Sequence, residues 1–588
     1  MKLFIYQKNN DSNSPPKDNA YRKVRPHQIH LPKHFSHELM LYGGLLVLLL
    51  ALILFWVFSA GDGGRPEQED HPPVQSTGQQ NDPNRDDDET DSNSSTEPPA
   101  PVDLGGYSIS TSSEYAANAG AEILNAGGNA VDAAIAIAYN LAVSEPYASG
   151  LGGGGCMVIY DPETEAFTFY NYGAEAPKSG KSKLTLVPGF VSGMEALRED
   201  YGTMDYETLL QSALACCDGI EISAHGALRI KNASGVLSKS TPFFDQNGHY
   251  LKEGDILKQP ELKQTLQRLI DEGPASFYTG SIAEDIVAAS ALTMADLAAY
   301  QTIKTEAVVG TFQEYTVGAA AAPFSGATLI QMLKMAEMLD MPDPDEDSKG
   351  FLADLEKISQ TSQHERISNI CDLRFSKNKL DQNEMVSDQY IAKLLDLDVT
   401  FLEEEEECED TTGFTVVDSH GMVVACTNTL SSFFGVKRSV DGFFLNNTGY
   451  LFGSNINAYQ SGKRPRTHIS PAILISEDQV LAVASPGGNL ITKVLANVVL
   501  DVCRFGEEPQ TAVDKQRVVF MQGNLLYYET GYDTPLLTKV SGQGYRSIPS
   551  SYHPYFGNVA MSGYHKDDGF FAVEDPRRCG SARVSNDE

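Results

Sequence analysis

Residues 410–430 read DTTGFTVVDSHGMVVACTNTL, and they contain two β-prone runs separated by a short polar turn with a glycine. Such runs on either side of a glycine-bearing turn indicate a β-hairpin. A three-residue turn pairs Thr411 with Thr429, whereas a two-residue turn pairs Thr412 with Thr429. Both registers bring two hydroxyls together at the open end of the hairpin, because directly opposed side chains lie within reach of each other. The hairpin thus offers a candidate nucleophile with a positioning partner, although threonine is also simply a common strand residue.

The chain has 588 residues and a formal net charge of -35. Its length exceeds that of a typical domain, so we expect two lobes or one large layered domain with a tail. The acidic composition argues against nucleic acid as a partner, because phosphate binding requires a basic surface. Part of the charge is local: residues 61–106 hold 12 acidic and 2 basic residues among many Pro, Ser, Asn and Gln. A segment of this composition buries too little apolar surface to fold, and we interpret it as a disordered stalk.

Residues 41–60 form an uncharged, leucine-rich run, long enough to cross a bilayer as a helix of about 20 residues. The preceding residues 1–40 carry seven Lys or Arg against three Asp or Glu, which by the positive-inside rule makes them a cytoplasmic tail. A cleaved signal peptide would have a shorter apolar core nearer the N-terminus. The sequence therefore predicts a type II single-pass membrane protein, held by a transmembrane signal anchor, with the rest of the chain extracellular or lumenal.

An extracytoplasmic location is consistent with three glycosylation acceptors, at Asn93, Asn232 and Asn446. All eight cysteines follow the apolar run, which permits disulfides without requiring them in a domain of this size. No pair of them has metal-ligand spacing with His, so we predict no metal site and no other cofactor.

Helical and strand patterns alternate after the stalk. Residues 114–125 have apolar side chains at helical spacing and end at Gly-Gly, and Asn129 is placed to cap a second helix rich in small residues. The next run, GLGGGG at 150–155, formally fits a dinucleotide fingerprint, but a helix precedes it and a strand at 156–160 follows, the reverse of the order that a phosphate cradle needs. These glycines more plausibly let the backbone pass close to another element. We also predict helices at 196–200, 206–216, 264–272 and 491–504, and strands at 307–318 and 482–484.

Two further stretches bear on the hairpin. Residues 403–409 are almost all acidic and stop just before it; such runs are usually solvated and flexible, and exposed segments of this kind are where a chain can be cut. Residues 485–488, SPGG, precede a predicted helix, so their backbone N–H groups can face an anion in the manner of an oxyanion hole. Taken alone, a turn of this kind is more often only a loop.

Seven motifs together resemble the γ-glutamyltransferase (glutathione hydrolase) family, over residues 107–582. They are NAGGNAVDAAIA (125–136), EPYASGLGGGG (145–155), VPGFVSG (187–193), DTTGFTVVD (410–418), SGKRPRTHISP (461–471), SPGG (485–488) and EDPRR (574–578). The resemblance implies an α/β fold of the N-terminal-nucleophile hydrolase type, an α+β sandwich with four layers, αββα. It also implies a precursor, or zymogen, that cuts its own Asp410–Thr411 bond. Residues 107–410 would form the large-chain part of the ectodomain and 411–588 the small chain, held together as a heterodimer.

Self-cleavage explains why a threonine follows the acidic run. The Thr411 hydroxyl would attack the preceding carbonyl to form an ester, and hydrolysis would free an α-amine with a reference pKa of about 7.7 to 8.0 that can act as a base. By resemblance, Thr429 orients this hydroxyl, and the N–H groups of Gly487 and Gly488 stabilise the oxyanion. The implied substrate is a glutathione-like small molecule whose γ-glutamyl, or related acyl, group is hydrolysed or transferred.

The substrate-binding positions depart from the family pattern. Residues 178–186 contain lysines but lack the arginine that clamps the substrate carboxylate, and a lysine does not reproduce a bidentate fork. Ser431 stands where the family has Asn, Thr448 replaces a group that would hold the substrate ammonium, and Thr467-His468 replaces a Ser-Ser pair. The loss of charged partners costs roughly 2 to 5 kcal/mol for each buried charge left unpaired. We expect retained self-cleavage with altered recognition.

Two classes of function follow. The first is a divergent γ-glutamyltransferase-like ectoenzyme acting through Thr411, with weak or absent turnover of glutathione itself; the retained nucleophile, its partner and the glycine pair favour it. The second is a catalytically impaired pseudoenzyme of the same fold that acts as a surface binding protein; the altered substrate positions favour it.

Overall fold

The computed structural model describes residues 103–377, 381–399, 410–521, 525–531, 546–550 and 553–586. The predicted cytoplasmic tail, the apolar run at 41–60, most of the stalk, Asn93 and the acidic run lie outside these residues. Strand β1 (Gly106–Thr111) already begins at the last residue assigned to the stalk. In the described part of the chain, no helix has the length and apolarity needed to span a bilayer.

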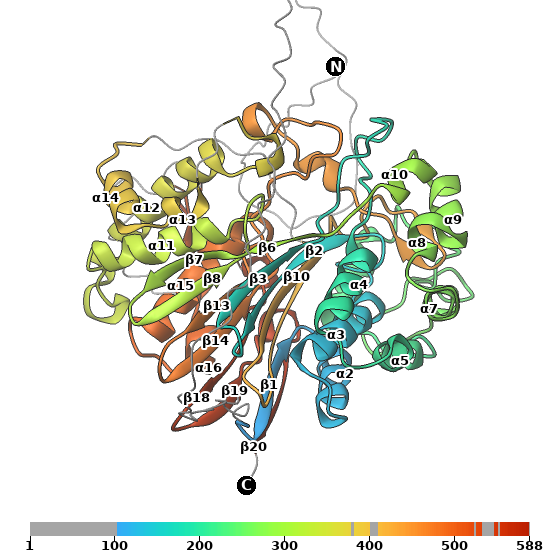
Figure 1. Ribbon diagram of the computed structural model, residues 1–588, viewed down its shortest axis with the longest axis horizontal. Helices are drawn as coiled ribbons and strands as arrows, with labels where there is room; N and C mark the ends of the chain where they lie inside the picture. Colours follow the sequence, from blue (N-terminus) through green and yellow to red (C-terminus); the bar gives the residue numbers. More distant parts are fainter. Residues whose placement is uncertain are drawn as a thin grey trace, which may run out of the picture. The chain divides into compact units, whose positions relative to one another are not determined.

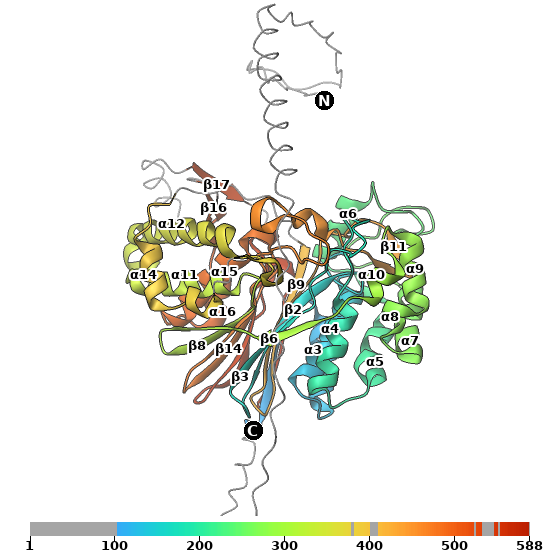
Figure 2. The same ribbon diagram turned by 45° about the horizontal axis from the view of Figure 1, so that its top comes forward.

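Two sheets lie face to face between two layers of helices (Figure 1, Figure 2). The first sheet contains, in spatial order, β20 (Ser581–Asn586), β1, β9 (Asp410–Val417), β10 (Val423–Ser431), β2 (Gly154–Asp161), β3 (Ala166–Asn171) and β6 (Ile303–Glu306). The second contains β19 (Gly569–Ala572), β18 (Ala560–His565), β14 (Gln479–Ala484), β13 (Ala472–Ile475), β8 (Tyr315–Ala319) and β7 (Val308–Phe312). Strand β9 packs against β18 and β14 of the other sheet. The order of layers is the αββα order expected from the sequence.

Helices cover the outer face of each sheet (Figure 1). Those on the first sheet include α2 (Glu114–Asn125), α3 (Ala130–Ser144), α4 (Phe190–Tyr201) and α5 (Tyr206–Cys216). Those on the second are α11 (Gly326–Met338), α12 (Pro344–Asn369) and α15 (Ile491–Cys503). The remaining helices and strands are α6 (Ala224–Ala233), α7 (Pro260–Glu272), α8 (Ser276–Thr279), α9 (Ser281–Ala289), α10 (Met294–Ala298), α13 (Gln382–Met385), α14 (Asp388–Leu395), α16 (Pro509–Asp514), β4 (Ile220–Glu221), β5 (Ile256–Leu257), β11 (Ser439–Val440), β12 (Phe443–Phe444), β15 (Val518–Phe520), β16 (Leu525–Glu529) and β17 (Arg546–Ser550).

Helix α3 forms where its cap and its small residues predict. Asn129 Oδ1 accepts hydrogen bonds from the N–H groups of Val131 and Asp132, and the Asp132 carboxylate accepts in return from the Asn129 N–H. This reciprocal pair satisfies donors that the first helical turn leaves unbonded. Every residue of α3 except Ser144 is buried, because a helix rich in alanine can pack closely on both the sheet and its neighbouring helices.

The central hairpin adopts the first of the two predicted registers. Thr411 lies opposite Thr429, and the Asp418 N–H donates to the Met422 carbonyl over 3.1 Å, which closes a three-residue turn. The glycine run before β2 does allow close backbone contact: a Cβ added to Gly153 would lie 2.4 Å from the Thr429 carbonyl oxygen. The glycines therefore bring this segment against the hydroxyl-bearing end of the hairpin.

One predicted strand is divided in two. Residues 307–318 are two strands, β7 and β8, paired with each other rather than continuous. The chain reverses at Gln313, whose φ of 50° is left-handed and breaks the extended run. β-Branched residues on both sides of the turn conceal this reversal in the sequence.

Candidate active site

The nucleophile predicted from the sequence and its partner lie at the open end of the β9–β10 hairpin. Thr411 Oγ1 donates to Thr429 Oγ1 over 3.5 Å, and the Thr411 side chain is 4% exposed. Catalytic contacts of this length are common before substrate binds. A β-bulge between Thr429 and Ser431 directs the Ser431 N–H onto Thr429 Oγ1 at 2.8 Å. This backbone donor fixes the Thr429 hydroxyl beside the Thr411 side chain.

The alternation of β9 determines which way the nucleophile points. Thr415 faces the second sheet, since Ser562 Oγ on β18 donates to its hydroxyl over 2.8 Å. Gly413 faces the same way, because a Cβ added there would lie 3.1 Å from the Ser485 backbone nitrogen. Side chains two residues apart share a strand face. Thr411 is therefore directed toward the loop that contains the SPGG motif.

That loop has the backbone expected of an oxyanion site. Gly487 and Gly488 have φ values of 140° and 56°, which only glycine adopts readily. Leu490 N–H donates to the Gly487 carbonyl over 3.1 Å and begins the turn that leads into α15. The N–H groups of the two glycines precede this first bonded donor, the position that leaves helix N-termini open to an anion.

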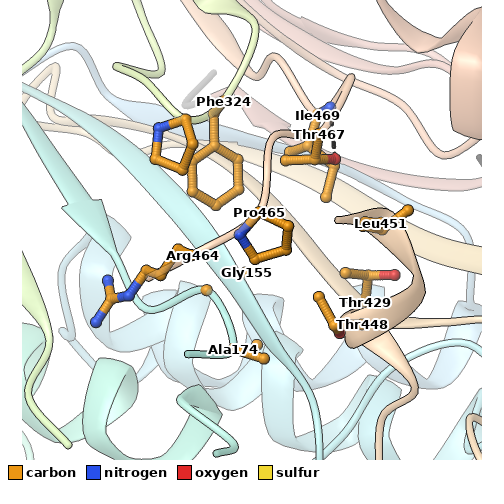
Figure 3. A pocket seen from close by; sticks show the side chains of 13 residues that line it. Gly155, Ala174, Phe324, Thr429, Thr448, Leu451, Arg464, Pro465, Thr467 and Ile469 are labelled. Carbon is orange, nitrogen blue, oxygen red and sulfur yellow. Dashed lines mark hydrogen bonds between the residues drawn. The ribbon is translucent and has the colours of Figure 1, made fainter. Parts of the chain in front are cut away.

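A narrow cavity of about 30 Å³ lies beside Thr429 (Figure 3). Figure 3 shows Thr429 and Thr448 next to each other on one side, with Phe324 and Pro465 across from them. Its full lining is Gly154, Gly155, Gly173, Ala174, Pro323, Phe324, Thr429, Thr448, Leu451, Arg464, Pro465, Thr467 and Ile469. A space this small holds part of an acyl group, not a whole peptide, since ligand pockets are typically about 300 Å³ or more.

Three of the four predicted substrate residues belong to this region. Thr448 and Thr467 line the cavity, and Ser431 shares a hydrogen bond with Thr448, with 2.8 Å between the hydroxyl oxygens. His468 is buried and does not belong to the cavity lining; its carbonyl accepts a hydrogen bond from Thr492 Oγ1 over 3.0 Å. Ser431 and Thr448 thus form a neutral hydroxyl pair at positions where the family carries groups for a charged head.

The lysines that could replace the carboxylate clamp do not line the cavity. Lys183 Nζ is 3.5 Å from the centre of the Tyr459 ring, and Lys178 Nζ donates to the Ala299 carbonyl over 3.4 Å. Neither they nor Lys181 contribute to the described lining. The cation that does reach it is Arg464, which the sequence did not single out within its motif. Its guanidinium donates to Asn171 and to the Gln301 carbonyl, so its aliphatic part, not its charge, adjoins the cavity.

Asn446 supports the site and is a poor glycosylation acceptor. Its amide nitrogen donates to the carbonyls of Gly152 and Leu186, and its oxygen accepts from the Thr448 N–H. Asn446 is 0% exposed, so the folded arrangement argues against a glycan on this nitrogen. Asn232 is exposed near the end of α6, and its glycosylation stays a prediction.

A family model described as gamma-glutamyltranspeptidase matches residues 116–585. The chain belongs to the γ-glutamyltranspeptidase family. A relative named capsule biosynthesis protein CapD proenzyme, from Bacillus anthracis, is 34% identical over 486 residues, which cover 82% of this chain and 91% of the relative. A glutathione hydrolase proenzyme from Bacillus subtilis is 29% identical over 535 residues, 81% of this chain and 90% of that protein.

A solved structure shows that this member of the γ-glutamyltranspeptidase family has a known fold. The crystal structure of a cephalosporin acylase from Bacillus halodurans superimposes with a TM-score of 0.73 at 21% sequence identity, covering 85% of this chain and 99% of that one. The mixed α/β fold of the N-terminal-nucleophile hydrolases is therefore confirmed. Members of the γ-glutamyltranspeptidase family are processed into large and small chains and act on small molecules.

Proposed function

We propose that this protein is a self-processing threonine enzyme that cuts its own Asp410–Thr411 bond and then transfers or hydrolyses a γ-glutamyl or related acyl group. The observation that carries the proposal is the pairing of Thr411 with Thr429 at 3.5 Å, on the strand face that meets the SPGG loop at Ser485. Nucleophile, positioning hydroxyl and oxyanion donors are the parts that acyl transfer through a threonine requires.

Self-cleavage proceeds as an acyl shift followed by hydrolysis. Thr411 Oγ1 attacks the carbonyl carbon of Asp410, the C–N bond breaks, the nitrogen takes up a proton, and an ester links the two residues. Water then adds to the ester, which releases a carboxyl group at Asp410 and the free hydroxyl and α-amine of Thr411. The amine formed in this step is close to its own hydroxyl and serves as its base, so no His–Asp pair is needed.

Turnover uses the same hydroxyl. Thr411 Oγ1 attacks the donor carbonyl, its proton passes to the α-amine, and the departing amine of the substrate takes that proton as the C–N bond breaks. Water or a second amine then resolves the acyl-enzyme. The names found in the comparisons support both branches, since one relative is a glutathione hydrolase and the matching family model is described as gamma-glutamyltranspeptidase.

The substrate differs from glutathione in how its head group is recognised. Ser431 and Thr448 are buried and hydrogen-bond each other, so they offer neutral hydroxyls where an ammonium would require a carboxylate. We therefore expect weak or absent glutathione turnover. On the apolar run at 41–60 and the basic residues before it, we further propose an extracellular or lumenal enzyme with a type II anchor.

The full chain, purified in detergent, tests the proposal by electrophoresis and N-terminal sequencing. We expect two fragments, the smaller one beginning at Thr411, and a single uncut chain for Thr411→Ala. A wild-type chain that stays in one piece on prolonged incubation would refute self-processing.

The neutral Ser431–Thr448 pair also favours a second candidate, a surface pseudoenzyme that binds a partner without turnover. Testing Thr411→Ala in cells distinguishes the enzyme from the pseudoenzyme. If a deletion phenotype is fully restored by Thr411→Ala, the binding role is supported; if only the wild-type chain restores it, the enzyme is.

A further inference from the structure

The end of β9 that carries the nucleophile is held along one edge only. Strand β1 pairs with β9 from Val417 to Phe414 and stops there, whereas β10 continues to pair as far as Thr411 and beyond. Cutting the chain before Thr411 removes the covalent tether on its other side. Residues 411–413 then form a strand end that is paired with β10 alone, and a strand end of this kind unfolds locally with ease.

Thr412 connects this end of β9 to the segment that follows α3. Its side chain points away from that of Thr411, because neighbouring residues of a strand face opposite ways. Thr412 Oγ1 donates to Ser149 Oγ over 3.0 Å, and the two side chains are 0% and 1% exposed. A hydrogen bond in such a dry environment resists exchange with water.

Ser149 belongs to a segment that is itself firmly held. The Ala148 carbonyl accepts from the Leu430 N–H over 2.9 Å, directly after Thr429 on β10. Glu145 anchors the start of the segment, because its carboxylate accepts from Ser112 Oγ at 2.7 Å and from the Tyr147 hydroxyl at 3.1 Å. Ser112 directly follows β1. Residues 145–149 therefore bridge the end of β1 and both strands of the hairpin, at the point where β1 no longer supports β9.

We propose that Thr412 is a positioning residue, whose hydrogen bond to Ser149 holds the Thr411-bearing end of β9 in register with Thr429. The expected effect of Thr412 on the rate of self-cleavage rests on the proposed function. Its effect on the position of the β9 end does not. Thr412→Val keeps the β-branched shape and loses the donor, whereas Thr412→Ser keeps the donor and loses one methyl group.

Two measurements on the purified full chain test this role. The first is the rate of self-cleavage, expected to fall roughly tenfold in Thr412→Val, as loss of a buried hydrogen bond predicts, and to recover in Thr412→Ser. The second is amide hydrogen exchange of the peptide covering 411–417, expected to quicken in Thr412→Val and not in Thr412→Ser. Ser149→Ala removes the same bond without altering β9, and adding it to Thr412→Val should bring no further loss.

The outcomes separate the two proposals. An uncut wild-type chain would refute self-processing, while the exchange comparison would still decide the positioning role. Wild-type cleavage and wild-type exchange in Thr412→Val would overturn the inference. Equal impairment in Thr412→Val and Thr412→Ser would also overturn it, since a shape effect would then suffice. Should Thr412→Val fail to fold, the same comparison is made with Ser149→Ala.

Discussion

At the scale of single residues, the site depends on hydroxyls fixed by backbone donors. Thr429 illustrates this, because the bulge that follows it supplies an N–H to its oxygen at 2.8 Å. The pairing of Thr429 with Thr411 could be predicted from the sequence, since strand alternation and turn length restrict the register to two choices. The bulge could not, because it depends on how residues 431–448 fold back over the strand end.

Replacing Thr429 tests the positioning of the nucleophile. Thr429→Val should slow self-cleavage roughly tenfold or more, because it removes the hydroxyl that contacts Thr411 while keeping the side-chain shape; tenfold corresponds to about 1.4 kcal/mol. Thr429→Ser should retain most of the rate. Fragment formation over time, followed by electrophoresis, measures both. A rate in Thr429→Val equal to that of the wild type would show that Thr411 needs no partner hydroxyl.

At the scale of elements, local signals predicted helices better than strands. Helices α2 and α5 run over the predicted residues, because capping and apolar spacing are encoded within each segment. The β7–β8 reversal at Gln313 and the burial of Asn446 were not predicted. Both features involve neighbours that are distant in the sequence. Strand β8 pairs with β13, and the Leu186 carbonyl accepts a hydrogen bond from the Asn446 amide. A residue pattern that is local carries little information about such contacts.

The segment that begins at Glu145 should be sensitive to pH. Burial raises the pKa of this carboxyl from 4.5 to about 7, although hydrogen bonds from Ser112 and Tyr147 and the charges of Arg578 and Arg229 act in the opposite direction. Because the folded-state pKa is the higher one, the protonated form stabilises the fold below about pH 4.5, and this stability is lost as pH rises through about 7. The loss amounts to roughly 3 kcal/mol at most, at 1.36 kcal/mol per pKa unit.

Glu145→Gln should remove this pH dependence, since the amide does not ionise. Its oxygen can accept from one of the two hydroxyl groups, of Ser112 or Tyr147, and its nitrogen donates to the other. Denaturant unfolding at pH 5 and pH 8 measures it: we expect the variant to gain stability over the wild type at pH 8 and to gain little at pH 5. An identical difference at the two pH values would contradict the role of this carboxyl.

At the scale of the whole molecule, the two proposed chains are interleaved. In the first sheet, β9 and β10 lie between β1 and β2, and in the second, β13 lies between β8 and β14. The small chain therefore contributes inner strands to both sheets, and separating the chains would expose both hydrophobic cores. We expect the cut protein to elute as one particle in size-exclusion chromatography and to separate only in denaturant. Separation of the fragments in native buffer would contradict this arrangement.

The strand order also sets a sequence of events in time. The β9–β10 hairpin alone can bring Thr411 to Thr429, but the SPGG loop follows β14 of the second sheet and reaches this face of β9 only when the two sheets lie together. An unfolded chain therefore lacks the oxyanion donors that the proposed self-cleavage needs. Under the proposed self-cleavage, a cut chain is therefore one in which the two sheets have folded together. A chain that crosses a membrane in the unfolded state would be inactive during translocation and would become active in the compartment where its two sheets fold together.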